Sequence, residues 1–145
     1  MSTPRYFTSL TLPSEVGSVR KASAFLLETA RNLRIPKASD PMFEVAIVEA
    51  LTNAVKHGGT SHEDVIRCEL ELVDRTLILR IVDAGPGFAL PPGAAAFPKA
   101  GPTETLAESG YGLPIIQAVF PVVKGFVRED GFCLELSVSL RPVTT

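Results

Sequence analysis

The residues that could do chemistry begin with Glu49 and Asn53, in the segment EALTNAVKH at positions 49–57. A separation of four residues places both side chains on one face of a helix, about one turn apart, and Lys56 falls beside them. An asparagine oxygen suits Mg²⁺, and a glutamate can deprotonate a hydroxyl nucleophile. An ordinary solvated helix face would carry the same residue types, so this segment alone leaves both interpretations open.

A second candidate is the segment DAGPGF at positions 83–88, where Asp83 ends an apolar run and is followed by Gly85 and Gly87. A carboxylate at a strand end can accept a hydrogen bond from an exocyclic amine, such as adenine presents. The two glycines allow the backbone to turn tightly and to approach a flat ring. A plain turn at the end of a strand would show the same pattern.

A third candidate is the segment SGYGLPII at positions 109–116, in which Gly110 and Gly112 precede a predicted helix. Free N–H groups where a glycine-rich approach meets a helix are suited to phosphate. A simple joint between a loop and a helix is the alternative, and Leu113 is a core residue under either interpretation. The three segments together, in this order, are more specific than any one of them.

Helices must position the first and third segments. Hydrophobic periodicity predicts helices over 14–33, 41–57 and 113–120. Ser14 and Asp40 are the predicted N-caps of the first two, and Gly58 is the predicted stop of the second.

Alternating strands must form the rest of the fold. The expected strands cover 6–12, 64–73, 76–83, 122–127 and 132–140. Because hairpins join only some of them, we expect a mixed β-sheet. Each strand has one apolar face, which predicts helices on one side only. The expected fold class is therefore α/β, a two-layer sandwich, and the Pro- and Gly-rich stretch before Gly110 is expected to be a functional lid or a disordered loop.

Composition limits the partners. The 145 residues, 46% of them hydrophobic, predict a single domain over 1–145, and a net charge of -2 without a long basic run argues against direct nucleic-acid binding. No apolar run is long enough for a membrane span, so we expect no membrane partner and a cytoplasmic protein. Cys68 and Cys133 are expected to be inert strand residues, since two cysteines and the two histidines do not make a metal site.

On these three segments the chain resembles the GHKL ATPase superfamily, which includes gyrase and the histidine kinases. Within it, the chain is most similar to the anti-sigma factor serine kinases of bacterial partner-switching systems. Positions 49–57 match the asparagine box of that family, and positions 83–88 and 110–116 match its two glycine boxes. The resemblance covers nearly the whole chain and implies the Bergerat fold.

The resemblance also implies roles for single residues. Glu49 would be the catalytic base for a serine hydroxyl, and Asn53 would bind Mg²⁺. Asp83 would bind the adenine amine of ATP, in a pocket shaped by Gly85 and Gly87.

Further contacts to ATP are implied at the second glycine box and the end of the helix. Gly110, Tyr111, Gly112 and Leu113 would supply backbone contacts to the phosphates, and residues 89–109 would form the ATP lid. Lys56 and His57 are assigned to the phosphates or to the protein partner.

The implied partners are a sigma factor and a STAS-domain anti-sigma antagonist, which the kinase would phosphorylate on serine; the family commonly forms homodimers. Two features depart from the family pattern: Phe132 follows Gly131 where the family often has Thr, and Lys99 is the only basic residue of the lid. A nucleotide-binding anti-sigma or switch module without kinase activity is therefore an alternative, as is a switch kinase that binds no sigma factor. A histidine kinase catalytic domain or a gyrase-type ATPase is less expected, because the chain has no room for their additional domains.

Overall fold

The computed structural model describes residues 5–58, 61, 63–87 and 112–140. Its helices lie between the first two strands and again before the fourth: α1 (Val16–Asn32), a 3-10 helix (Pro36–Ser39), α2 (Pro41–His57) and α4 (Leu113–Val119). Its strands are β1 (Tyr6–Pro13), β2 (Val65–Val73), β3 (Thr76–Asp83), β4 (Val122–Arg128) and β5 (Gly131–Ser139). The predicted lid at 89–109 lies outside the described residues.

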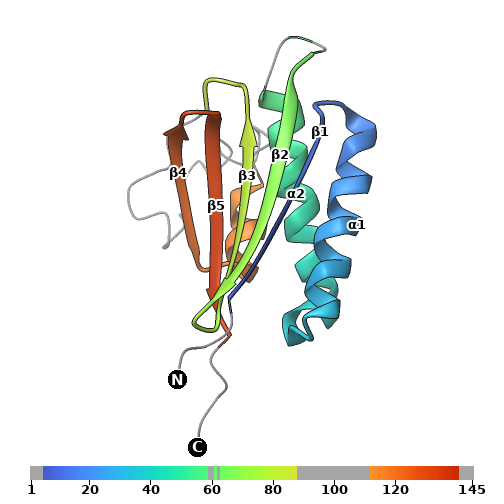
Figure 1. Ribbon diagram of the computed structural model, residues 1–145, viewed down its shortest axis with the longest axis vertical. Coiled ribbons are helices and arrows are strands. Elements are labelled where there is room, and N and C mark those ends of the chain that lie inside the picture. The colour runs from blue at the N-terminus through green and yellow to red at the C-terminus, as the bar shows by residue number, and fades with distance from the viewer. Residues whose placement is uncertain (1–4, 59–60, 62, 88–111, 141–145) are drawn as a thin grey trace, which may run out of the picture.

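The strands form one sheet in the order β1-β2-β3-β5-β4 (Figure 1). Within the described residues, all four strand pairings are antiparallel, so the prediction of a mixed sheet was wrong. The reason is topological: the β4–β5 hairpin returns β5 between β3 and β4, which separates two strands that run in the same direction. β2 separates β1 from β3 in the same way.

The register fixes which end of the sheet each segment reaches. Asp83 at the end of β3 pairs with Phe132 at the start of β5, whereas Thr76 at the start of β3 pairs with Ser139. Tyr6 pairs with Leu72, just before the β2–β3 turn. The start of β1 and the end of β5 therefore lie together at one end of the strands, and Asp83 lies at the other end.

The helices cover one face of the sheet, which confirms the predicted two-layer α/β sandwich (Figure 1). Between the layers, Phe43 of α2 meets Phe120 after α4, with ring centroids 5.7 Å apart. The fully buried side chains come from both layers and include Leu26, Phe43, Ile47, Leu51, Ile66, Leu70, Leu77, Leu79, Ile81, Leu113, Ile116 and Phe120. Among the described helices, none combines the length and the apolar character that a membrane span requires.

The helix ends agree with the sequence at α2 but not at α1. The Asp40 carboxylate accepts a hydrogen bond of 2.9 Å from the Met42 amide, and α2 ends at His57 before Gly58, as predicted. The N-cap of α1 is Glu15 rather than Ser14, and its side chain makes no capping hydrogen bond. The Ser14 amide instead donates to the Asp64 carbonyl at 2.9 Å, which ties this turn to the segment before β2.

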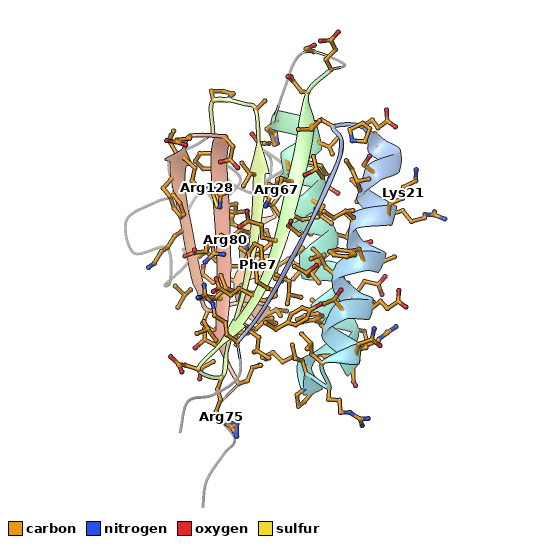
Figure 2. The ribbon with its side chains drawn as sticks, viewed as in Figure 1. Phe7, Lys21, Arg67, Arg75, Arg80 and Arg128 are labelled. Carbon is orange, nitrogen blue, oxygen red and sulfur yellow. The ribbon has the colours of Figure 1, made fainter. Side chains whose placement is uncertain are left out.

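The other face of the sheet carries a network of charged side chains (Figure 2). Arg128 of β4 binds both carboxylate oxygens of Glu69 on β2, at 3.1 and 3.0 Å. Arg80 of β3 bridges Glu71 at 3.0 Å and Glu135 at 2.9 Å. Although this face has no helix over it, Glu69 and Glu71 are only 4% and 6% exposed, because the arginine side chains cover them.

Candidate functional site

Helix α2 presents the first candidate residues from its last two turns. Asn53 is 4% exposed, and Glu49, one turn earlier, is half-buried. The local sequence produces this arrangement because Phe43, Ala46, Ile47, Ala50 and Leu51 anchor the same helix on the sheet with no exposed area. The polar pair is thereby held at the border of the core rather than on a freely solvated face.

The candidate carboxylate Asp83 lies at the end of β3, opposite the C-terminal turn of α2. Its Oδ1 accepts a hydrogen bond of 2.8 Å from the Gly85 amide, which closes a tight turn. Burial raises the pKa of the Asp83 carboxyl from 3.8 to about 6, while the Gly85 hydrogen bond opposes that shift. Asp83 thus offers a second, desolvated oxygen as a hydrogen-bond acceptor.

Glycines let α2 and the Asp83 turn approach each other closely. A Cβ on Gly58 would lie 2.6 Å from the Asp83 Cβ, and a Cβ on Gly85 would lie 2.5 Å from the His57 carbonyl oxygen. Both distances are far below van der Waals contact, so any side chain at either position would push the helix away from the turn. Gly85 has the shaping role that the sequence predicted, and Gly58 has a second role besides ending α2.

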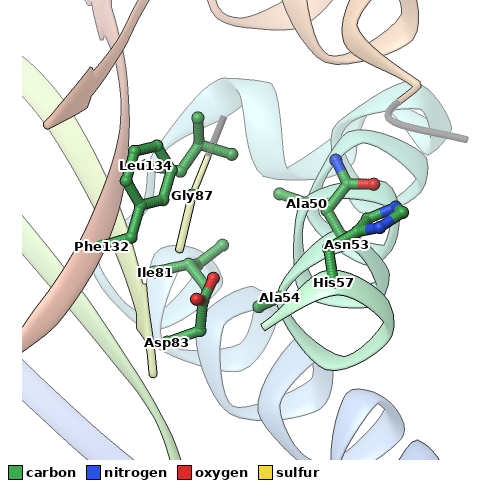
Figure 3. A pocket seen from close by; sticks show the side chains of 9 residues that line it. All are labelled: Ala50, Asn53, Ala54, His57, Ile81, Asp83, Gly87, Phe132 and Leu134. Carbon is green, nitrogen blue, oxygen red and sulfur yellow. The ribbon is translucent and has the colours of Figure 1, made fainter. Parts of the chain in front are cut away.

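A small pocket of about 10 Å³ lies between the end of α2 and strands β3 and β5 (Figure 3). Helix α2 lines one side of this pocket and the two strands line the other, with Gly87 between them. The lining residues are Ala50, Asn53, Ala54, His57, Ile81, Asp83, Gly87, Phe132 and Leu134. Four predicted site residues, Asn53, His57, Asp83 and Gly87, therefore surround one cavity.

Glu49 faces the start of α4 instead of this cavity. Gly112 precedes α4 with φ = +57°, a left-handed conformation that strongly favours glycine, and a Cβ there would collide with Glu49 Oε1. The predicted base on α2 and the second glycine box thus meet at Gly112. The Leu113 side chain is buried in the core, which leaves its backbone as the part available to a ligand.

The remaining predicted residues divide into two groups. Gly110 and Tyr111 lie outside the described residues. Lys56 is exposed and lines a separate groove between α1 and α2, together with Val19, Arg20 and Val48. The structure therefore does not bring Lys56 into the Asp83 pocket.

Sequence reasoning missed the apolar lining of the pocket. Ala50 and Ala54 lie four residues apart on α2, and their small side chains leave the space that the pocket occupies. Ile81 and Leu134 were assigned to the core of the sheet and also form the wall. The signal for the alanines was a pair of small residues on the same helix face as Asn53.

The donor set is compatible with Mg²⁺ but cannot form a complete metal site by itself. The part of the chain that the structure describes has no group of three or more His, Cys, Asp or Glu side chains arranged for a metal ion. Asn53 and Glu49 offer oxygen atoms one helical turn apart, and Mg²⁺ usually takes only one or two protein ligands, with the rest from phosphates and water. The residues present fit such a shared site.

Comparison with known proteins adds three findings. The family model of the histidine kinase-like ATPase domain matches residues 12–138. The sensor protein KdpD of Escherichia coli is 30% identical over 89% of this chain, although the match spans only 16% of that protein. The crystal structure of the RsbU and RsbW domains of Rv1364c from Mycobacterium tuberculosis superposes with a TM-score of 0.57 at 19% identity, covering 97% of this chain and 34% of that one.

Proposed function

Because the chain belongs to the histidine kinase-like ATPase domain family, we propose that it binds ATP with Mg²⁺ and transfers the γ-phosphate to a serine of a protein partner. The observation that carries this proposal is that Glu49 meets Gly112 at the start of α4. Asn53, one helical turn after Glu49, lines the Asp83 pocket. A base and a neutral oxygen ligand then follow one another on α2, and the acceptor for adenine lies opposite the end of that helix.

Asp83 would recognise the adenine. One of its oxygens is already occupied by the Gly85 amide, so the other accepts a hydrogen bond from the exocyclic amine. Ala50, Ala54 and Ile81 offer an apolar wall to the ring, which is typical of pockets that bind flat heterocycles. This assigns specificity for the base to the end of β3 and α2.

Glu49 would act at the other end of the nucleotide. Its carboxylate accepts the proton of the serine hydroxyl as the oxygen attacks the γ-phosphorus, and the bond to the leaving ADP oxygen breaks. Asn53 would hold Mg²⁺ through its amide oxygen, where the ion would neutralise charge on the phosphates. Backbone amides at Gly110, Tyr111, Gly112 and Leu113 are proposed to hold the phosphates, and residues 89–109 to form the lid over them.

The proposed partners are a sigma factor and a STAS-domain antagonist that carries the serine. The three motifs support this choice, since in combination they resemble anti-sigma factor kinases, and so does the shared fold with a structure that includes an RsbW domain. We further propose a homodimer, a cytoplasmic location and residues 1–145 as one ATPase domain. The chain spans 16% of the curated relative and 34% of the solved chain that it matches.

The test is a transfer assay with γ-labelled ATP and a purified STAS-domain antagonist. The parental protein is expected to label a serine of the antagonist. The Glu49→Gln variant should keep the parental dissociation constant for ATP and lose transfer by about 10²- to 10⁴-fold, the usual contribution of a general base. Parental transfer by this variant would overturn the assignment of Glu49, and no labelling by either protein would overturn the kinase.

A second candidate function is a nucleotide-dependent switch module without kinase activity. The feature in its favour is the predicted lid at 89–109, whose only basic residue is Lys99, so few positive charges are available to stabilise a transferring γ-phosphate. The same assay separates the two functions. ATP binding and sigma-factor binding without label transfer would favour the switch module.

A further inference from the structure

The pocket beside Asp83 is closed to any nucleotide base. Its volume of about 10 Å³ is close to that of a single water probe. Pockets that hold small organic ligands have volumes of roughly 300–1,000 Å³. If ATP binds here, as the proposed function requires, at least one lining side chain must move away first.

Phe132 is the largest side chain that lines this pocket. It is the second residue of β5, pairs with Asp83 across the sheet and is 6% exposed. Its ring lies directly against Gly87: a Cβ on Gly87 would lie 2.6 Å from the Phe132 Cγ. The ring therefore occupies the side of the pocket that is formed by Asp83 and Gly87.

The other apolar side chains that line the pocket are poorly suited to open it. Ala50 and Ala54 have no side-chain torsion that could move a heavy atom. Ile81 and Leu134 are 1% and 4% exposed and belong to the core under α2, where a rotamer change would leave a void. Phe132 belongs to the same core, but it is the second residue of its strand and lies next to the β4–β5 turn.

Gly87 lies directly against the Phe132 ring. It has φ = +77°, and its lack of a side chain is what allows the ring to lie so close. The ring and Gly87 together fill the side of the pocket that faces α2. A base that stacks on Ala50 and Ile81 and reaches Asp83 would need that same space.

We infer that Phe132 is a gate of the base pocket: its ring fills the site in the free protein and must turn away from Gly87 before a nucleotide base can enter. This inference rests on the proposed nucleotide binding. The ring competes with the base, so the apparent dissociation constant for ATP exceeds the intrinsic one by the inverse of the open fraction. An open fraction of about one tenth would weaken binding about tenfold.

The experiment measures ATP binding by calorimetry for the parental chain, Phe132→Thr, Phe132→Val and the matched control Phe7→Thr. Phe7 is also a phenylalanine on a strand, but it lies exposed on β1, on the sheet face without helices. Threonine and valine both suit a strand, and valine keeps the site apolar if threonine prevents folding. We expect the two Phe132 variants to bind ATP about tenfold more tightly than the parental chain and Phe7→Thr to bind like it.

Association kinetics provide a second readout. Because side-chain rotations are fast, the ring opens and closes many times before ATP binds, so the rate constant for ATP association should be about tenfold lower in the parental chain than in Phe132→Val. Equal association rate constants in the two proteins, or equal or weaker binding by the Phe132 variants, would overturn the gate while leaving nucleotide binding intact. Binding by the variants alone would support it, and binding by none of the proteins would overturn both the gate and the proposed function.

Discussion

At the scale of single residues, the carboxyl group of Asp83 titrates near pH 6 in this fold, because burial raises its pKa from 3.8 to about 6. Only the ionised form presents an acceptor on both oxygens, one for the Gly85 amide and one for an adenine amine. A proton on Asp83 therefore competes with the nucleotide. The consequence is a link between ATP affinity and pH in a range where most carboxyl groups no longer titrate.

We predict that ATP binds about tenfold more weakly at pH 5 than at pH 7, because one pH unit below a pKa leaves about a tenth of the group ionised. The measurement is the dissociation constant for ATP between pH 5 and pH 8. Asp83→Asn is the control, since it should bind more weakly overall but without this dependence. An identical pH profile in Asp83→Asn would assign the effect to the phosphates and contradict the prediction.

The same scale shows what the sequence could and could not predict about the site. Asn53, Asp83 and Gly87 line one pocket, as a short motif with a glycine pair suggests. The sequence places Lys56 beside Asn53 on the helix. At about 100° per residue, however, Lys56 is rotated roughly 60° from Asn53, in the direction opposite to Ala50 and His57. That angle turns it to the α1 groove, a distinction that depends on where the sheet lies.

At the scale of the elements, the first turn of α2 stabilises the helix that positions the residues of its last turns. The Asp40 carboxylate caps the Met42 amide, and Pro41 occupies the first helical position. Because Asn53 and His57 contact the pocket from the last two turns, fraying or displacement of this helix acts on the site directly.

We predict that Asp40→Ala lowers the free energy of unfolding by about 1 kcal/mol, the usual cost of losing an N-cap. Urea unfolding at neutral pH measures this quantity. Ser14→Ala is the matched control, because the N-cap of α1 is Glu15 and a loss of Ser14 should change stability by less than about 0.5 kcal/mol. Equal losses in the two variants would contradict the capping role of Asp40.

The charged face of the sheet is a second element with a measurable contribution. Burial alone would raise the pKa of Glu69, but hydrogen bonds from Arg128 and Arg67 outweigh it and hold the pKa below its usual range. Glu71 is held low in the same way by Arg80 and Arg5, against the effect of its burial. These carboxylates therefore stabilise the fold above pH 4.5, and the contribution disappears as the pH falls through their lowered pKa values.

We predict that Glu69→Gln lowers the free energy of unfolding by about 2 kcal/mol at pH 7, because Arg67 and Arg128 lose their shared partner. The cost should be smaller than that of a fully buried pair, since both arginine side chains are partly exposed. Below the lowered pKa of Glu69, the difference between parent and variant should shrink, because the parental carboxyl is then also neutral. Urea unfolding at pH 7 and at successively lower pH values measures this difference and its loss.

Asp130→Asn is the control for this network. Asp130 pairs with the same Arg128, but its side chain is 44% exposed, so its loss should cost less than about 1 kcal/mol. An equal cost for Asp130→Asn and Glu69→Gln would show that burial of Glu69 contributes nothing.

The elements were more predictable from the sequence than their arrangement. The strand β3 and the α2 helix have the expected bounds, because alternation, Asp40 and Gly58 are local signals. The direction of pairing between β3 and β5 is not local, since the two strands are separated by almost fifty residues. The prediction of a mixed sheet failed for that reason, since the described strand pairs are antiparallel.

At the scale of the whole molecule, the pocket joins the two layers of the sandwich. Helix α2 supplies Asn53 and His57, while β3 and β5 supply Asp83 and Phe132. A ligand in this position contacts both layers and is present only when they are assembled, so its binding energy is added to the stability of the whole fold.

We predict that ATP with Mg²⁺ at 100 times its dissociation constant stabilises the protein by about 2.7 kcal/mol, which corresponds to a rise of roughly 5–10 °C in the midpoint of thermal unfolding. Scanning calorimetry measures this midpoint. Chelation of Mg²⁺ should reduce the shift, and GTP should give a smaller one, because its carbonyl oxygen would face the Asp83 carboxylate. An equal shift with GTP would contradict adenine recognition by Asp83.

The direction of the strands also determines where the chain can be extended. The outer ends of β1 and β5, at Tyr6 and Ser139, lie beside the β2–β3 turn, whereas Asp83 lies at the far end of β3. Seven residue steps along β3 separate these two ends of the sheet, which is a distance of roughly 23 Å. An affinity tag, a fluorophore or a fused domain attached beyond either strand thus starts well away from the pocket, which suits this unit to immobilisation and to being carried within longer polypeptides.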